Sequence, residues 1–273
     1  MRQSLLRVAI FAAALTLTLT SSESALSAQS PAQVLAPTGT LRAVFLGMNP
    51  VQGRIDENSG KPSGPVPDLV EALARRVGVP AAITSSPNAA GIVAALNTGA
   101  ADVGFLAYDP ARARDVDFGA AFMVMFNSYL VRGDSPLQKT ADVDRAGITV
   151  AAVRGQTQEL FVSGALKSAK VRVFDAMPPQ REVETLLLNR TVDAFAINRQ
   201  RSIEAEAASQ GKLRALPDSF LAVDQSFVVR KGDGAKLPLI KAFVEDAKAS
   251  GLIRSSIARA RLVGVDEPGG SPK

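Results

Sequence analysis

The side chains that could do chemistry in this 273-residue chain are restricted, because the chain contains neither histidine nor cysteine. Serine–histidine–aspartate catalysis, cysteine nucleophiles, histidine or thiolate metal sites and disulfide bonds are therefore excluded. Any reaction would have to use carboxylates, lysine, tyrosine or arginine. Aromatic rings are also scarce, with 12 Phe, 2 Tyr and no Trp. We expect no cofactor, no metal and no catalytic residue.

One short segment has the chemistry of an anion site. Gly155, Gln156 and Thr157 lie between an expected strand and an expected helix, where backbone N–H groups without helical partners favour negative charge. Gly155 would let the backbone approach a ligand closely, and the hydroxyl of Thr157 adds a donor. Thr157 would equally suit the N-cap of the helix, with Glu159 in the first turn, and the two roles are compatible.

The elements that must position these residues alternate between strand and helix. The first set has strands at residues 40–46, 81–84 and 101–106, with one helix opening at Asp68 and another near Asn88. The second set has strands at 147–153, 171–174 and 192–197, with helices at 156–168, 178–189 and 199–210. Such alternation is typical of parallel α/β sheets, so the sequence predicts an α/β protein with two lobes.

Two similar segments flank the second set. Residues 128–134 and 226–233 are each an apolar or aromatic run that ends in a charged glycine turn. We interpret them as crossover strands that carry the chain into the second lobe and back, and the alternative is a pair of unrelated edge strands. The predicted organisation is lobe 1 over residues 39–130, lobe 2 over 131–226, and a return to lobe 1 over 227–262 that contains two helices.

The ends of the chain have distinct compositions. Residues 1–28 are typical of a cleaved secretory signal, with Arg2 and Arg7, an apolar stretch over residues 8–20 and small residues before Ala28. The apolar stretch is too short for a stable membrane anchor. We expect a disordered lead-in at 29–38 and a loose tail at 263–273. Without a cysteine to carry lipid, a soluble periplasmic protein is the predicted product.

The net charge of +5 comes from scattered basic residues rather than a dense run. Because these residues are not interleaved with aromatic residues, we expect no nucleic-acid surface. A mild positive charge fits attraction of an anionic solute, and it fits simple solubility equally well.

Four segments, taken in order, carry a resemblance to a known family. They are residues 56–64 with Pro67-Asp68-Leu69, residues 92–102, residues 109–118 and residues 154–159. Together they resemble the bacterial family-3 periplasmic solute-binding proteins, the polar amino-acid receptors of ABC transporters, over residues 39–260. The resemblance implies a two-lobed periplasmic-binding-protein type II fold with two crossover hinge strands. It also implies a monomer that closes on an amino acid or other small carboxylate and delivers it to an ABC transporter permease.

The resemblance further implies that Arg112 holds the carboxylate of the ligand. A guanidinium presents a planar fork that matches a carboxylate, and hydrogen bonds to charged groups contribute about 1.5–3 kcal/mol each. The alternative is a surface salt bridge to Asp115 or Asp117, a role for which Arg114 is the better candidate.

Several positions depart from the family pattern. Asn198 stands where amino-acid receptors place an acid that pairs with the ammonium of the ligand, and an amide cannot neutralise a cation. Asn49 and Ala89 stand where rings are common, and Ala107 replaces a hydroxyl residue, leaving Tyr108 as a nearby ring. These departures favour a carboxylate without an amino group, or a polar neutral solute. The predicted ligand-binding residues are Arg112, Thr157, Gln156, Gly155, Asn198, Ala107, Tyr108 and Asn49.

Two alternative functions share this fold. One is a dehydratase-like periplasmic enzyme, which would need an acid or base in the cleft. Glu182 and Glu184 are candidates, although their helix face favours solvation. The other is an accessory protein of a periplasmic dehydrogenase or a sensing partner of a receptor.

Overall fold

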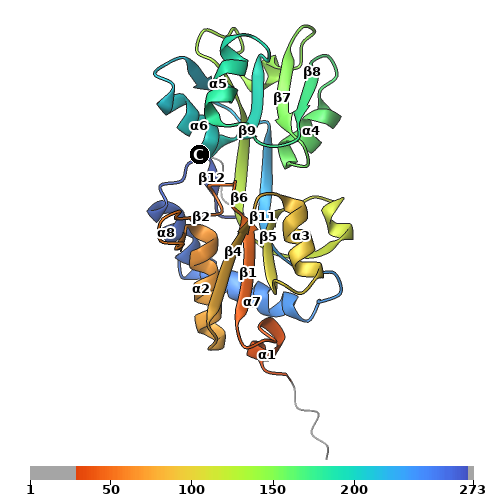
Figure 1. The fold of residues 1–273 in the computed structure, drawn as a ribbon, viewed down its shortest axis with the longest axis vertical. Helices are drawn as coiled ribbons and strands as arrows, with labels where there is room; N and C mark the ends of the chain where they lie inside the picture. Colours follow the sequence, from red (N-terminus) through yellow and green to blue (C-terminus); the bar gives the residue numbers. More distant parts are fainter. Residues whose placement is uncertain (1–28, 270–273) are drawn as a thin grey trace, which may run out of the picture.

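The protein was analysed as a computed structural model, which describes residues 29–269. The expected signal peptide at residues 1–28 lies outside the described residues. Within them, two lobes lie one above the other and share a ten-stranded mixed sheet with the order β4-β1-β5-β11-β6-β9-β7-β8 (Figure 1). The strands β10 and β12 both pair with β6, off this path. The predicted two-lobed α/β architecture is confirmed.

Lobe 1 is built on three parallel strands, in which β1 pairs with both β4 and β5. Alternate side chains of each strand face opposite sides of the sheet: Phe45 and Phe105 join a core with α2, α7 and α8, whereas Val44 and Leu106 join a second core with α3. This two-sided burial explains why the central strands β1 and β5 are mostly apolar, whereas the exposed edge strand β4 contains Thr84, Ser85 and Ser86. The elements are β1 (Leu41–Leu46), α2 (Pro65–Val77), β4 (Ala81–Ser86), α3 (Ala89–Asn97), β5 (Val103–Ala107), α7 (Lys236–Ala249) and α8 (Leu252–Arg259).

Lobe 2 repeats the plan with β7 between β8 and β9, both parallel to it. Val150 and Ala152 of β7 pack in a core with α4, and Ala151 and Val153 pack in a core with α5 and α6. The elements are η2 (Thr140–Asp142), β7 (Thr149–Val153), α4 (Thr157–Ala165), β8 (Lys170–Phe174), α5 (Gln180–Leu188), β9 (Ala194–Asn198), α6 (Arg199–Ala208) and β10 (Leu213–Ala215).

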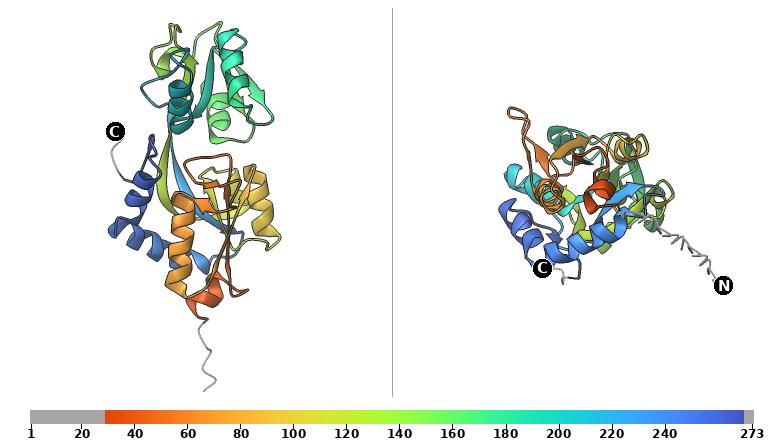
Figure 2. Two further views of the ribbon diagram at one scale, coloured as in Figure 1. Left: turned by 60° about the vertical axis from the view of Figure 1, so that its left-hand side comes forward. Right: turned by 90° about the horizontal axis from the view of Figure 1, so that it is seen from below.

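Two long antiparallel strands, β6 (Val116–Arg132) and β11 (Leu221–Arg230), connect the lobes. The strand β6 pairs with β11 as far as Asn127 and with β9 from Asn127 onward, so its pairing changes lobes at that residue. Gln225 of β11 already pairs with Ala107 of β5 in lobe 1. The chain thus crosses back before residue 225, slightly earlier than the predicted boundary at 226/227. The helices that follow β11 lie beside lobe 1 in both further views (Figure 2).

The termini of the described chain are more ordered than the sequence indicates. Residues 31–35 form the helix α1 (Pro31–Leu35), capped by Ser30 and anchored by the buried Leu35, so the expected disordered lead-in is wrong there. In the expected loose tail, β12 (Val265–Asp266) pairs with β6. Neither segment has enough periodicity for recognition from sequence, since each depends on contacts with distant elements.

The loop after β1 contains a small hairpin of β2 (Arg54–Ile55) and β3 (Pro62–Ser63). In residues 29–269, no helix has the length and hydropathy needed to cross a bilayer.

Candidate ligand site between the lobes

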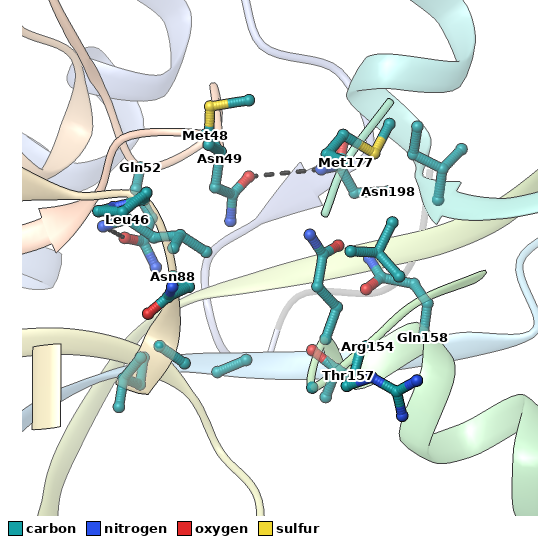
Figure 3. A pocket seen from close by; sticks show the side chains of 18 of the residues that line it. Leu46, Met48, Asn49, Gln52, Asn88, Arg154, Thr157, Gln158, Met177 and Asn198 are labelled. Carbon is teal, nitrogen blue, oxygen red and sulfur yellow. Dashed lines mark hydrogen bonds between the residues drawn. The ribbon is translucent and has the colours of Figure 1, made fainter. Parts of the chain in front are cut away.

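A cavity of about 270 Å³ lies between the lobes, next to the hinge strands. It is lined by the segments that follow the carboxyl ends of β1, β4 and β5 in lobe 1 and of β7, β8 and β9 in lobe 2. This is the position where open parallel sheets place their ligands, because short loops there bring side chains and backbone groups from several strands together. Figure 3 shows Asn49, Gln52 and Asn88 on one wall, facing Thr157, Gln158 and Asn198 on the other.

Arg112 projects into this cavity from η1 (Arg112–Arg114), the short turn after β5. Its Nη1 donates to the carbonyl of Ala107 at 2.9 Å, and its Nη2 donates across the cleft to the carbonyl of Gly155 at 2.7 Å. Burial lowers the pKa of the guanidinium, and the nearby carboxylate of Asp109 partly offsets this effect. The group still stays charged at neutral pH, because the pKa of arginine begins far above it.

The alternative role for Arg112, a surface salt bridge, is not what the structure contains. Asp117 pairs instead with Lys231 at 2.8 Å, and this contact lowers the pKa of Asp117. Arg114 is exposed. Within the described residues, the guanidinium of Arg112 therefore has only backbone carbonyls as hydrogen-bond partners, with Asp109 acting at longer range, as expected of a group that can receive an anion.

The turn between β7 and α4 lines the cavity, but its details differ from the expectation. Gly155 has a φ of 70°, a conformation that favours glycine, and no atom lies within 4 Å of the Cβ that alanine would add. Glycine is thus favoured by the backbone conformation, and the approach of this backbone to a ligand stays a prediction. The N–H of Gly155 donates to Glu159 at 3.2 Å. The N-cap residue is Gln156 rather than Thr157, so Thr157 is not the cap that the sequence allowed.

Asn198 and Asn49, both predicted, meet across the cleft. The Nδ2 of Asn198 donates to the Oδ1 of Asn49 at 3.4 Å (Figure 3), and both residues are buried. The Oδ1 of Asn198 also accepts from the backbone N–H of Arg201 at 2.9 Å and so caps α6. One side chain therefore orients a helix and connects the two lobes.

The structure does not bring Tyr108 to this cavity, and we remove it from the candidate site. Its side chain is half exposed, borders a different cavity with Leu160 and Asp224, and packs edge-on against Phe118. Tyr108 follows β5 directly, so its side chain points to the opposite side from that of Ala107. The other seven predicted residues line the interlobe cavity.

Sequence analysis missed several polar residues of the cavity, of which Gln52, Gln225 and Arg201 matter most for the site. Gln52 and Gln225 form a buried pair in which the Nε2 of Gln52 donates to the Oε1 of Gln225 at 3.0 Å. Arg201 enters from the first turn of α6. A polar residue in the otherwise apolar return strand was the available signal for Gln225, and the spacing of Arg201 three residues after Asn198 was the signal for the arginine.

The cavity carries few acids. Of the described residues that line it, only Asp175 has a carboxylate, which is 87% exposed and pairs with Arg154 at 2.7 Å. No group of three or more acidic side chains suited to a metal ion occurs within residues 29–269. The arginines and amide donors of the cavity are chemically suited to hold a small anion.

Comparisons with known proteins support this geometry. The family model described as bacterial extracellular solute-binding proteins, family 3, matches residues 43–259. A search of the curated proteins finds no match. Among solved structures, a mutant of ArgBP from T. maritima is 24% identical, with a TM-score of 0.67 over 85% of this chain and 99% of that chain.

Two further structures are similar to this chain. An amino acid ABC transporter substrate-binding protein from Streptococcus pneumoniae, bound to L-arginine, is 19% identical, with a TM-score of 0.69 over 86% of this chain and 100% of that chain. An ancestral amino acid-binding protein, described as a precursor of cyclohexadienyl dehydratase, is 23% identical, with a TM-score of 0.68 over 85% and 99%. At these identities, the likenesses show the shared two-lobed fold.

Proposed function

The chain belongs to the bacterial extracellular solute-binding proteins of family 3, and from this premise we propose that it is the periplasmic binding component of an ABC-type importer. It binds a small carboxylate-bearing solute in the interlobe cavity, and the lobes close over the solute by bending at β6 and β11. The closed form is the one that the permease recognises. Closure is favoured because contacts from both lobes to the same ligand exist only in that state.

The observation that carries this proposal is the position of Arg112. Its guanidinium lies in a cavity bounded by both lobes, forms hydrogen bonds to Ala107 of lobe 1 and Gly155 of lobe 2, and has no carboxylate partner among the described residues. A ligand carboxylate would supply the missing countercharge where water is largely excluded, and charge-assisted hydrogen bonds are strongest there.

Binding is favoured over catalysis by the carboxylates. Glu182 and Glu184, the acids that a dehydratase-like reaction could use, lie on α5 outside the cavity, and Glu184 pairs with Lys212 at 3.2 Å. Asp175 is exposed and paired with Arg154. None of these groups has the shielded, unpaired position that a general acid or base needs.

The test is a thermal-shift and calorimetric screen of amino acids and of mono- and dicarboxylic acids against the wild type, Arg112→Ala and Arg114→Ala. We expect acids to stabilise the wild type and Arg114→Ala. Arg112→Ala should lose affinity by about 100-fold or more, because two charge-assisted bonds disappear. Equal binding by Arg112→Ala would contradict the site, and turnover of a ligand would favour the enzyme alternative.

A further inference from the structure

The cavity contains a second guanidinium whose partners resemble those of Arg112. Arg201, in the first turn of α6, donates from Nη1 to the carbonyl of Met48 in lobe 1 at 3.2 Å. Arg112 of lobe 1 donates in the opposite direction, to the carbonyl of Gly155 in lobe 2. Each arginine therefore starts on one lobe and reaches the backbone of the other, and both line the same cavity.

Neither guanidinium forms a salt bridge with any residue of the described chain. Glu204, three residues after Arg201, bonds instead to Arg54 at 3.0 Å and to Gln200 at 2.8 Å. Burial lowers the pKa of Arg201, the nearby charge of Glu204 opposes this effect, and the charge of Arg54 adds to it. Asp109 and Glu204 act on the two guanidinium groups without a direct bond to either. Two partly desolvated positive charges without a bonded carboxylate in one cavity favour an occupant that carries two negative charges.

The amide side chains of the cavity are neutral, so none of them can neutralise an ammonium group on a ligand. The side-chain oxygens of Asn49, Gln52, Asn88, Asn198 and Gln225 each already accept a hydrogen bond from the protein. An ammonium group would need free acceptors, whereas carboxylate oxygens need donors. Asp175, the only carboxylate among the described residues that line the cavity, is exposed and paired with Arg154, so an ammonium group on the ligand would find no free countercharge there.

Gln225 adds a free donor. Its orientation is fixed, because the N–H of Leu46 donates to the Oε1 of Gln52, whose Nε2 in turn donates to the Oε1 of Gln225. The Nε2 of Gln225 is left without an acceptor, although the residue is completely buried and borders the cavity. A buried donor without a partner is destabilising, so it marks a place for an acceptor from the ligand.

Continuing from the proposed function, on which this inference rests, we propose that the ligand is a small dicarboxylate without an amino group. One carboxylate binds Arg112, the second binds Arg201, and the amide nitrogen of Gln225 donates to an oxygen of the ligand. Arg201 is thereby a specificity-determining residue, because it binds a second carboxylate that monocarboxylates lack. Since Arg201 belongs to lobe 2, this contact also favours closure of the lobes over the ligand.

The test is calorimetric titration of the full protein with the diacids from malonate to adipate, each compared with the monocarboxylate of equal carbon number. We expect at least one diacid to bind about tenfold to a hundredfold more tightly than its matched monoacid, because it makes an additional pair of charge-assisted bonds. Arg201→Met should reduce that diacid to the level of the monoacid. Arg181→Met, at an exposed position on α5 outside the cavity, should keep the preference.

The wild-type comparison needs no variant, so poor folding of Arg201→Met would not remove the test. If monoacids bind in an Arg112-dependent way as tightly as every diacid, this inference is wrong and the proposed function stands. If Arg201→Met keeps the diacid preference, the role of Arg201 is wrong. If no carboxylate binds the wild type, both the proposed function and this inference fail.

Discussion

At the scale of single residues, most polar side chains of the cavity form hydrogen bonds within the protein, and a few polar groups are left without a partner within residues 29–269. Asn198 uses its oxygen to cap α6 and its nitrogen to contact Asn49. The guanidinium of Arg112 has only backbone carbonyls as hydrogen-bond partners in the described chain. Neutral carbonyls fix the orientation of a guanidinium without neutralising its charge. The full free energy of the ion pair between that guanidinium and a ligand carboxylate can therefore contribute to ligand binding.

The amide at position 198 should set the choice between acids and amino acids. Asn198→Asp keeps an N-cap of equal quality and introduces a carboxylate next to the ligand. We expect the wild type to bind glutarate more tightly than L-glutamate, which differs from it only by the ammonium group. In Asn198→Asp, the ratio of the two dissociation constants should shift toward glutamate by about tenfold. Competition titrations measure the ratio, and an unchanged ratio would show that residue 198 does not face the ligand.

The difference between the residues that sequence could predict and those that it could not has a physical reason. Arg112, Gly155 and Asn198 lie at the ends of strands, where the pattern of a parallel sheet already predicts a ligand site. Gln225 lies inside a strand, and its role depends on pairing with Gln52, which is distant in sequence. Contacts of this kind leave no local pattern. Tyr108 was misplaced because its orientation depends on the register of β5 with β11.

At the scale of elements, strand ends determine the geometry of the site. Residues after β1, β5, β7 and β9 converge because parallel strands end at the same edge of each lobe. The turn from β7 to α4 depends on the left-handed conformation of Gly155. The sequence was sufficient to locate these strands and helices to within a few residues, since their apolar periodicity is strong. The full length of β6 was missed, because its first half includes Gly119 and several small residues.

Two glycines of the same region should respond in opposite ways to alanine. Gly155→Ala should destabilise the protein by about 1 kcal/mol, because alanine tolerates its φ of 70° poorly. Gly164, within α4, has open space where a Cβ would be placed, so Gly164→Ala should stabilise by roughly 0.5–1 kcal/mol through helix propensity. Urea unfolding of both variants measures the difference. Equal changes in the free energy of unfolding for the two variants would contradict the prediction, because they would mean that the turn at residue 155 adopts another backbone conformation without cost.

At the scale of the whole molecule, the two strands that join the lobes allow one lobe to move against the other. The lobes have separate apolar cores, and polar contacts such as Arg54 with Glu204 and Asn49 with Asn198 connect them across the cleft. Exposed ion pairs contribute little to stability, so the closed arrangement depends on what occupies the cavity. Sequence predicted the two lobes from two successive sets of alternating strands and helices, but the points where the chain crosses between them depend on strand pairing.

The most direct measurement of the central claim is the distance between the lobes in solution. Because the chain has no cysteine, Ala90→Cys in lobe 1 and Gln180→Cys in lobe 2, both exposed, give a uniquely labelled pair for single-molecule energy transfer. With a mixture of amino acids and straight-chain mono- and dicarboxylic acids, we predict a shift to shorter distances that is absent in Arg112→Ala. An unchanged distance, or the same shift in Arg112→Ala, would contradict closure over an anion held by that arginine.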